Sequence, residues 1–146
     1  MRRMLSLFSL VVLMAVVPIA SQVVTAGPAS ATGCQAGETL HVESTWTPNP
    51  LHHNGTAFRN DVTVTNCTNS SQSFSFGGTV SDPATCSNTS IAFGPIPETL
   101  AANASATYTQ VVDQPPTCLG TYTQVLNLIQ GGVTIKTITV TFSVIF

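Results

Sequence analysis

The last part of the chain, residues 120–146, alternates apolar side chains with hydroxyl-bearing ones over most of its length. A period of two residues is typical of a strand with one buried face and one solvated face. Thr, Val, Ile and aromatic residues also favour that pleated surface. Gln130-Gly131-Gly132 interrupts the pattern, and glycine allows the positive φ angles that hairpin turns require. The stretch therefore predicts two antiparallel strands, about 120–130 and 133–146.

The second of these strands has a defined inward face. Its even positions are expected to face a core: Ile138, Val140, Phe142, Val144 and Phe146. Thr139 and Thr141 are expected to face solvent. Upstream, Val133 and Ile135 have the opposite phase, so a β-bulge near Lys136-Thr137 is expected to reconcile the two halves.

Five further segments are expected to be strands, separated by polar turns, and the first two of them alternate in the same way. They are residues 39–47, 58–66, 72–80, 91–93 and 106–113. Gly94-Pro95-Ile96-Pro97 is expected to close the short strand 91–93, and its prolines suit an edge or a crossing between sheets, because proline cannot donate to a sheet ladder. No helical period recurs in residues 32–146. Seven short strands with polar turns predict an all-β fold, an immunoglobulin-like β-sandwich, with a closed barrel as the alternative.

The alternation also assigns individual side chains to the core. The expected inward residues of the first three strands are Leu40, Val42, Trp46, Phe58, Val62, Val64, Phe74 and Phe76. Gly77-Gly78 predicts a bulge or bend within its strand. Tyr122 stands near the entrance of its strand and is expected to be a corner tyrosine whose hydroxyl bonds the backbone.

The N-terminus has the composition of a secretory leader. Arg2 and Arg3 precede an apolar run from Met4 to Ala20, and Ala29-Ser30-Ala31 supplies small residues for cleavage. We expect a signal peptide over residues 1–31 and one secreted, extracellular domain over 32–146. Cleavage after Ala26, an uncleaved membrane anchor and lipidation of Cys34 are the alternatives. No membrane span is expected in the mature chain.

Charge excludes one class of partner. Loss of Arg2 and Arg3 with the leader takes the formal net charge from −2 to −4. Only Arg59 and Lys136 remain to contact phosphates, which argues against nucleic acid as a partner.

The mature chain holds four cysteines, namely Cys34, Cys67, Cys86 and Cys118. An even number behind a signal peptide predicts two disulfides formed in an oxidising compartment. The sequence contains no C-x-x-C spacing that would favour a structural metal instead.

Catalytic motifs are scarce. His41 and Glu43 lie on the same face of one expected strand, and His52 and His53 follow in the next loop, so these four residues are the candidate ligands of a metal-dependent enzyme. The sequence has no G-x-S-x-G nucleophile motif and no acidic calcium loop. The favoured interpretation is therefore a protein without catalytic residues, metal or cofactor.

Several turns resemble those of bacterial secreted immunoglobulin-like modules of the adhesion-related and glycosidase-associated type. The matching stretches are 63–66 with Asn69-Ser70, the turn at 100–105, and Pro116 followed by Gly120-Thr121-Tyr122. Asn103 stands where such modules commonly have glycine, and asparagine also reaches the left-handed conformation. The resemblance implies a non-catalytic envelope or extracellular module. The leading hypothesis for this chain is a structural, adhesive or binding role, with an unknown protein or glycan at the cell surface as its partner. A small-ligand carrier with a cleft in the sandwich is the second hypothesis.

The immunoglobulin-like arrangement selects one disulfide pairing. Successive strands run in opposite directions, which places Cys34 and Cys67 at one pole and Cys86 and Cys118 at the other. A strand of six residues spans about 20 Å, whereas bridged Cα atoms lie within about 7 Å. We therefore expect the pairs Cys34–Cys67 and Cys86–Cys118.

Overall fold

The computed structural model describes residues 33–55, 57–86, 89–113 and 116–146. The expected signal peptide, residues 1–31, lies outside these residues. Within them the chain forms eight strands and no helix: β1 (Leu40–Thr47), β2 (Leu51–His52), β3 (Phe58–Asn66), β4 (Gln72–Ser81), β5 (Ser90–Leu100), β6 (Ser105–Val112), β7 (Gly120–Gln130) and β8 (Val133–Ile145). The described residues accordingly include no helix that is long and apolar enough to cross a membrane.

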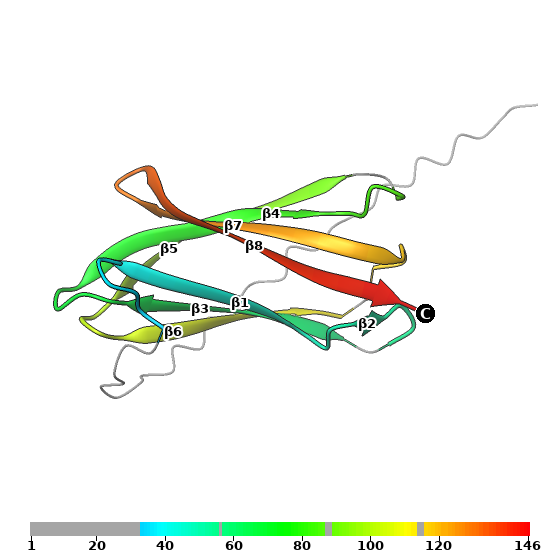
Figure 1. Ribbon diagram of the computed structural model, residues 1–146, viewed down its shortest axis with the longest axis horizontal. Helices are drawn as coiled ribbons and strands as arrows, with labels where there is room; N and C mark the ends of the chain where they lie inside the picture. The colour runs from blue at the N-terminus through cyan, green and yellow to red at the C-terminus, as the bar shows by residue number, and fades with distance from the viewer. Residues whose placement is uncertain (1–32, 56, 87–88, 114–115) are drawn as a thin grey trace, which may run out of the picture.

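The strands form two sheets rather than one closed barrel. One sheet has the order β1-β3-β6 and the other the order β2-β8-β7-β4-β5. Figure 1 shows them as two layers, with β1, β3 and β6 below β4, β7 and β8. All pairings are antiparallel except that of β2 with β8, which is parallel. The prediction of an all-β fold with a final hairpin is confirmed.

Two of the expected boundaries are wrong. The loop after β1 contains the short strand β2, because the backbone of Leu51 and His52 runs beside Val144 and Ile145 at the end of β8. The expected strand 91–93 is much longer, since β5 continues through Pro95 and Pro97 to Leu100. The prolines interrupt the ladder less than expected because β5 is an edge strand, paired on one side only with β4.

The core lies between the sheets and consists of two apolar clusters. The first packs β1 and β3 against β4 and β7, with Val64, Leu126 and Leu128 fully buried. The second is aromatic: the Phe142 ring stacks on Trp46 and Tyr122, with centroid distances of 4.3 and 5.0 Å. Every residue of the first three expected strands that was assigned to the core is buried.

A ring of polar side chains lies at the core between β1, β3 and β7. The Ser44 hydroxyl donates to the Gln124 amide oxygen at 2.8 Å, Gln124 donates to the Asn60 amide oxygen at 3.0 Å, and Asn60 donates back to Ser44 at 2.8 Å. The indole nitrogen of Trp46 also donates to Gln124 at 3.0 Å. Gln124 and Asn60 are each only 2% exposed. These contacts provide the partners that buried polar groups require and tie the two sheets together.

Strand β8 follows the expected phase only in its second half. Phe142 and Val144 are buried, Thr139 and Thr141 are exposed, and Ile138 and Val140 are half-buried. A bulge is present close to the expected place, because Leu128 pairs with Lys136 while Ile129 pairs with Thr134.

Three apolar residues of the expected strand 133–146 lie outside the core, and of these Phe146 had been expected to face it. Val133 and Ile135 are exposed, and Figure 1 shows the tip of the β7–β8 hairpin turned away from the sheet of β1, β3 and β6. Phe146 is 81% exposed, because it follows Ile145, the last residue of β8.

Disulfides close both ends of the fold. Cys34 is bonded to Cys67, with Cα atoms 5.7 Å apart, and Cys86 to Cys118, with Cα atoms 6.3 Å apart. These are the two pairs expected from the sequence. The first ties the segment before β1 to the turn after β3, and the second ties the β4–β5 loop to the segment before β7.

Candidate binding cleft between the two sheets

An apolar cleft of about 260 Å³ opens where the edges of the two sheets face each other. Its floor comes from β3 and β4, one wall from β5 and the other wall from β6. The main lining side chains are Asn60, Val62, Phe76, Phe93, Ile96 and Tyr108. The sheets are not closed over this side of the core.

Tyr108 forms the wall on the β6 side. Its ring lies 4.7 Å from that of Phe76, centroid to centroid, with a tilt of 43°. Burial and the neighbouring Glu98 carboxylate raise the pKa of Tyr108 far above its usual value. The hydroxyl therefore stays neutral at physiological pH, and this wall presents an uncharged aromatic ring whose hydroxyl is hydrogen-bonded to the Glu98 carboxylate.

The wall on the β5 side depends on two glycines. A Cβ atom on Gly94 would lie 2.6 Å from the carbonyl oxygen of Phe76, and one on Gly77 would lie 2.8 Å from that of Phe93. Gly94 also has a φ of +75°, which L residues with side chains rarely adopt. The ladder between β4 and β5 shifts register between Phe76 and Gly78, as the glycine pair predicted. This close approach of β5 to β4 sets Phe93 and Ile96 along the cleft.

The polar group in the floor is already engaged. Asn60 donates to the Ser44 hydroxyl and, at 3.3 Å, to the carbonyl oxygen of Thr45, and its own oxygen accepts from Gln124. Its amide therefore serves the core, and the cleft offers mainly apolar contact area. Thr109 and Gln110 supply polar groups where β6 borders the cleft.

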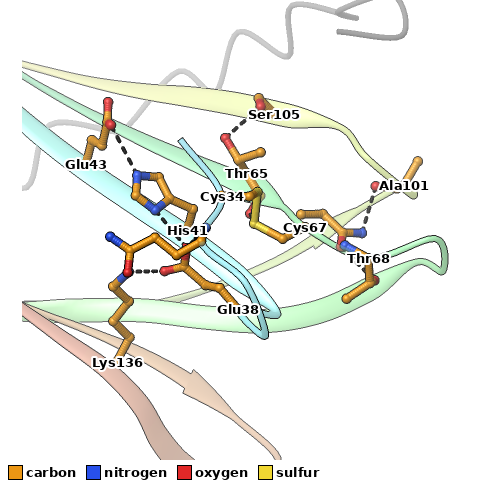
Figure 2. Close-up of a disulfide and its surroundings, with 12 residues drawn as sticks. Cys34, Glu38, His41, Glu43, Thr65, Cys67, Thr68, Ala101, Ser105 and Lys136 are labelled. Carbon is orange, nitrogen blue, oxygen red and sulfur yellow. Dashed lines mark hydrogen bonds and ion pairs between the residues drawn. A yellow bond between two sulfur atoms is a disulfide. The ribbon is translucent and has the colours of Figure 1, made fainter. Parts of the chain in front are cut away.

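A second, shallower hollow of about 390 Å³ lies at the seam between β1 and β8, lined by residues 35–40 with Ile135 and Lys136. Figure 2 shows the charged cluster beside it. His41 lies between two carboxylates, with Nδ1 3.0 Å from Glu38 and Nε2 3.1 Å from Glu43. Lys136 forms an ion pair with Glu38, which links the two sheets at this seam.

Glu38 is the centre of that cluster. Burial by itself raises the pKa of Glu38, but hydrogen bonds from Lys136, the Gln35 backbone amide and His41 together bring this pKa below its usual value. The carboxylate is thus held in its charged form by groups from both sides of the seam.

The structure does not bring the four candidate metal ligands together. His41 and Glu43 do share the outer face of β1, but His52 contacts the Phe146 carbonyl oxygen at 2.6 Å and His53 lies edge-on to the Phe146 ring. Within the described residues no three His, Cys, Asp or Glu side chains are grouped to hold a metal ion.

Two further kinds of reactive side chain, the cysteines and Tyr122, have structural roles. All four cysteines are in disulfides. The Tyr122 hydroxyl donates to the Cys118 carbonyl oxygen at 3.0 Å, which is the contact expected of a corner tyrosine. Burial, with Asp82 nearby, raises the pKa of Tyr122, so the donor proton is retained.

The turn beside the first disulfide is organised by the buried amide of Asn66; Figure 2 labels its neighbours Thr68 and Ala101. The Asn66 side chain is fully buried and donates to the carbonyl oxygens of Ser70, Leu100 and Ala101, while its oxygen accepts from Thr68. Asn103, in the facing turn, has a φ of +56°, the left-handed conformation expected there. Asn66 is therefore an anchor between two turns.

Sequence reasoning raised a cleft only as part of the carrier hypothesis, and it missed both the location of the cleft and the polar ring. One signal for the ring was present, because Asn60 and Gln124 occupy the apolar phase of their strands, between Phe58 and Val62 and between Tyr122 and Leu126. The cleft left no such signal. It depends on how far apart the edges of two sheets lie, and strand periodicity does not report that distance.

Comparisons with known proteins show similarity of fold alone. No protein-family model and no curated protein sequence matches the chain. The alkylpurine DNA glycosylase AlkC of Pseudomonas fluorescens is similar in structure, with a TM-score of 0.52 and 12% identity over 74% of this chain and 31% of that one. A β-D-glucoside glucohydrolase from Trichoderma reesei has a TM-score of 0.50 and 10% identity over 73% of this chain and 19% of that one.

A β-glucosidase from Listeria innocua is similar to the same degree, with a TM-score of 0.50 and 12% identity over 72% of this chain and 16% of that one. The chain thus spans less than a third of the length of each of these three proteins. Glycosidases at low identity are thus among the proteins that share this fold.

Proposed function

We propose that this chain is a non-catalytic, immunoglobulin-like module that works outside the cytoplasm, secreted or at the cell surface, in a structural, adhesive or binding role. The observation that carries the proposal is the pair of disulfides, one at each end of a two-layered all-β fold. Such bonds form and persist in oxidising compartments. The leader composition of residues 1–31 points to the same location.

The strand order supports the immunoglobulin-like part of the proposal. A three-stranded sheet of the first, third and sixth strands faces a sheet that contains β4, β7 and β8, as the immunoglobulin fold requires. Tyr122 supplies the corner contact. Two details depart from antibody domains: the disulfides lie at the ends and not between the sheets, and the core tryptophan, Trp46, is on β1.

A non-catalytic role agrees with how the reactive side chains are used. Asp61 accepts from Thr109 at 2.6 Å and pairs with Arg59 at 2.9 Å. His41 and Glu38 are occupied with each other. The activities named for the similar glycosylase and glucosidases belong to proteins that are more than three times longer than the part this chain matches.

The carrier hypothesis would use the apolar cleft. Its volume of about 260 Å³ falls below the roughly 300–1,000 Å³ of most ligand pockets. Pockets for small molecules also use a few free polar groups to orient the ligand, whereas the Asn60 amide is engaged in the core. We therefore favour the module over the carrier.

Fractionation of the producing organism tests the proposal. We expect the chain in the culture medium or on the cell surface, beginning near Thr32 by N-terminal sequencing, with both disulfides intact by non-reducing peptide mapping. Binding of the purified chain to intact cells, before and after protease or glycosidase treatment, would distinguish a protein partner from a glycan. A cytoplasmic chain that begins at Met1 with reduced cysteines would contradict the proposal.

A further inference from the structure

Strand β6 forms one edge of the three-stranded sheet. In the part of the chain that the structure describes, β6 pairs with β3 alone. The register is unbroken from the pair Phe58–Val112 to the pair Thr65–Ser105. The other edge of β6 therefore presents a regular row of backbone donors and acceptors, which is a template for a further strand.

The β6 edge lacks the usual devices that prevent strand addition. Its sequence, SATYTQVV, contains no charge, proline or glycine. The other edges carry such devices: β5 has Pro95 and Pro97, β1 has Glu43, and β8 has the bulge beside Lys136 and is covered at its end by β2. Prolines, charges, bulges and covering segments are the means by which edges are protected.

The apolar cleft lies directly beside this open edge. Tyr108 and Gln110 of β6 line it on one side and Phe93 and Ile96 of β5 on the other. A strand added to β6 would place alternate side chains above the cleft and the others on the outer face. In constant-type immunoglobulin domains a fourth strand occupies the corresponding place.

We propose that two copies of this chain pair through β6, antiparallel about a two-fold axis, so that the two three-stranded sheets become one continuous sheet. In such a pairing each residue meets a nearby residue of the identical strand. A charged residue near the centre would therefore face its own copy, and β6 has none. Each copy of Tyr108 would extend the apolar cover over the partner's cleft.

The outer face of β6 is suited to the same contact. The Thr63 and Thr107 hydroxyls are 2.9 Å apart, and those of Thr65 and Ser105 are 2.7 Å apart, so this sheet already uses hydroxyl pairs across strands. In a pairing centred on Thr109, each Thr109 would face its own copy, and Thr107 would face Val111, which is 54% exposed. Cross-strand pairs of β-branched residues stabilise sheets. The inference depends on strand order and holds whether or not the chain is secreted.

Sedimentation equilibrium over a concentration series tests the pairing. We expect a reversible dimer with a dissociation constant roughly in the micromolar range, typical of small interfaces. Thr109→Lys would place two like charges near the axis and should raise the dissociation constant at least about tenfold. Thr109→Val removes the same hydrogen bond to Asp61 without adding a charge and should leave the dissociation constant unchanged. Thr139→Lys adds the same charge to an exposed position on the outer face of β8 and should leave it unchanged.

Amide hydrogen exchange supplies a second readout that does not depend on a variant. Residues 105–112 should exchange more slowly as the protein concentration rises, while circular dichroism confirms that Thr109→Lys is folded. A chain that stays monomeric at about 1 mM, or a dimer that Thr139→Lys disrupts and Thr109→Lys does not, would overturn the proposal. If residues 105–112 are protected from amide exchange only after culture medium is added, the β6 edge binds a different partner, and the proposed self-pairing is overturned as well.

Discussion

The indole nitrogen of Trp46 donates a hydrogen bond of 3.0 Å to the amide oxygen of Gln124, across the space between the two sheets. The indole of Trp46 thus packs in the aromatic cluster, while its N–H group joins the hydrogen-bonded polar ring formed by Ser44, Asn60 and Gln124. The two sheets are joined in their interior by hydrogen bonds as well as by apolar contact.

The first prediction concerns this polar ring. Gln124→Leu keeps a large side chain but leaves Trp46 and Ser44 without their acceptor, and unsatisfied buried groups cost about 1–3 kcal/mol each. We expect a loss of about 2–4 kcal/mol in the free energy of unfolding, measured by chemical denaturation. Gln35→Leu, at an exposed position, is the control and should change it by less than about 0.5 kcal/mol. An equal effect of the two variants would contradict the role of the ring.

The second prediction compares two phenylalanines of the C-terminal segment. Phe142 is 2% exposed and Phe146 is 81% exposed. Phe142→Ala should lower the free energy of unfolding by about 3–5 kcal/mol, the usual cost of removing a buried ring. Phe146→Ala should alter it by less than about 0.5 kcal/mol. A loss below about 1 kcal/mol for Phe142→Ala would show that the inward phase of β8 is wrong.

The third prediction concerns the disulfides. They link residues 33 and 32 positions apart, and loops of this size imply a stabilisation of about 3–4 kcal/mol each in the chain-entropy model. Replacement of both cysteines of one pair by alanine should lower the unfolding free energy by that amount. Peptide mapping under non-reducing conditions checks the connectivity directly. A Cys67–Cys118 or Cys34–Cys118 peptide would refute the pairing and the strand order together.

The fourth prediction is a pH dependence that originates at Glu38. Burial raises the pKa of Glu38, but the hydrogen bonds from Lys136, Gln35 and His41 outweigh it and lower this pKa in the folded state. When the pKa of a carboxyl is lower in the folded state than in the unfolded state, it stabilises the fold at pH values above the unfolded-state pKa. This stabilisation is lost as the pH falls through the folded-state pKa. The native chain should therefore melt at a higher temperature than Glu38→Gln at pH 7. This difference in melting temperature should shrink as the pH falls below the usual glutamate pKa of 4.5.

Lys136→Met tests the cause of that effect. It removes the ion pair across the β1–β8 seam, so most of the pH-dependent advantage should vanish with it. A difference between the native chain and Glu38→Gln that stays constant from pH 7 to about pH 3 would contradict the linkage.

The fifth prediction addresses the metal hypothesis. Both ring nitrogens of His41 face carboxylate oxygens, and His52 contacts a backbone carbonyl. We expect EDTA to leave the melting temperature unchanged and zinc or calcium not to raise it. A clear drop in stability on chelation would mean that these side chains rearrange around an ion.

The alternation of apolar and polar residues along single strands allowed much of this fold to be predicted from the sequence. The inward faces of β1, β3 and β4, the bulge at Gly77-Gly78, and the Tyr122 corner depend on residues close together in the chain. Such features follow from the two-residue period of a strand and from backbone conformations that few residue types adopt. The disulfide pairing also followed once strand directions were assigned, because a strand is longer than a disulfide can reach.

The tertiary structure alone decided the features that depend on contacts between distant segments. Val133 and Ile135 have strand-like chemistry, yet they are exposed because the tip of the β7–β8 hairpin turns away from the facing sheet. The Trp46–Gln124 bond joins residues 78 positions apart, and the cleft exists because the β5 and β6 edges remain separated. Periodicity states which side of a strand is apolar, but the distance between two sheet edges is set by the packing of the whole core.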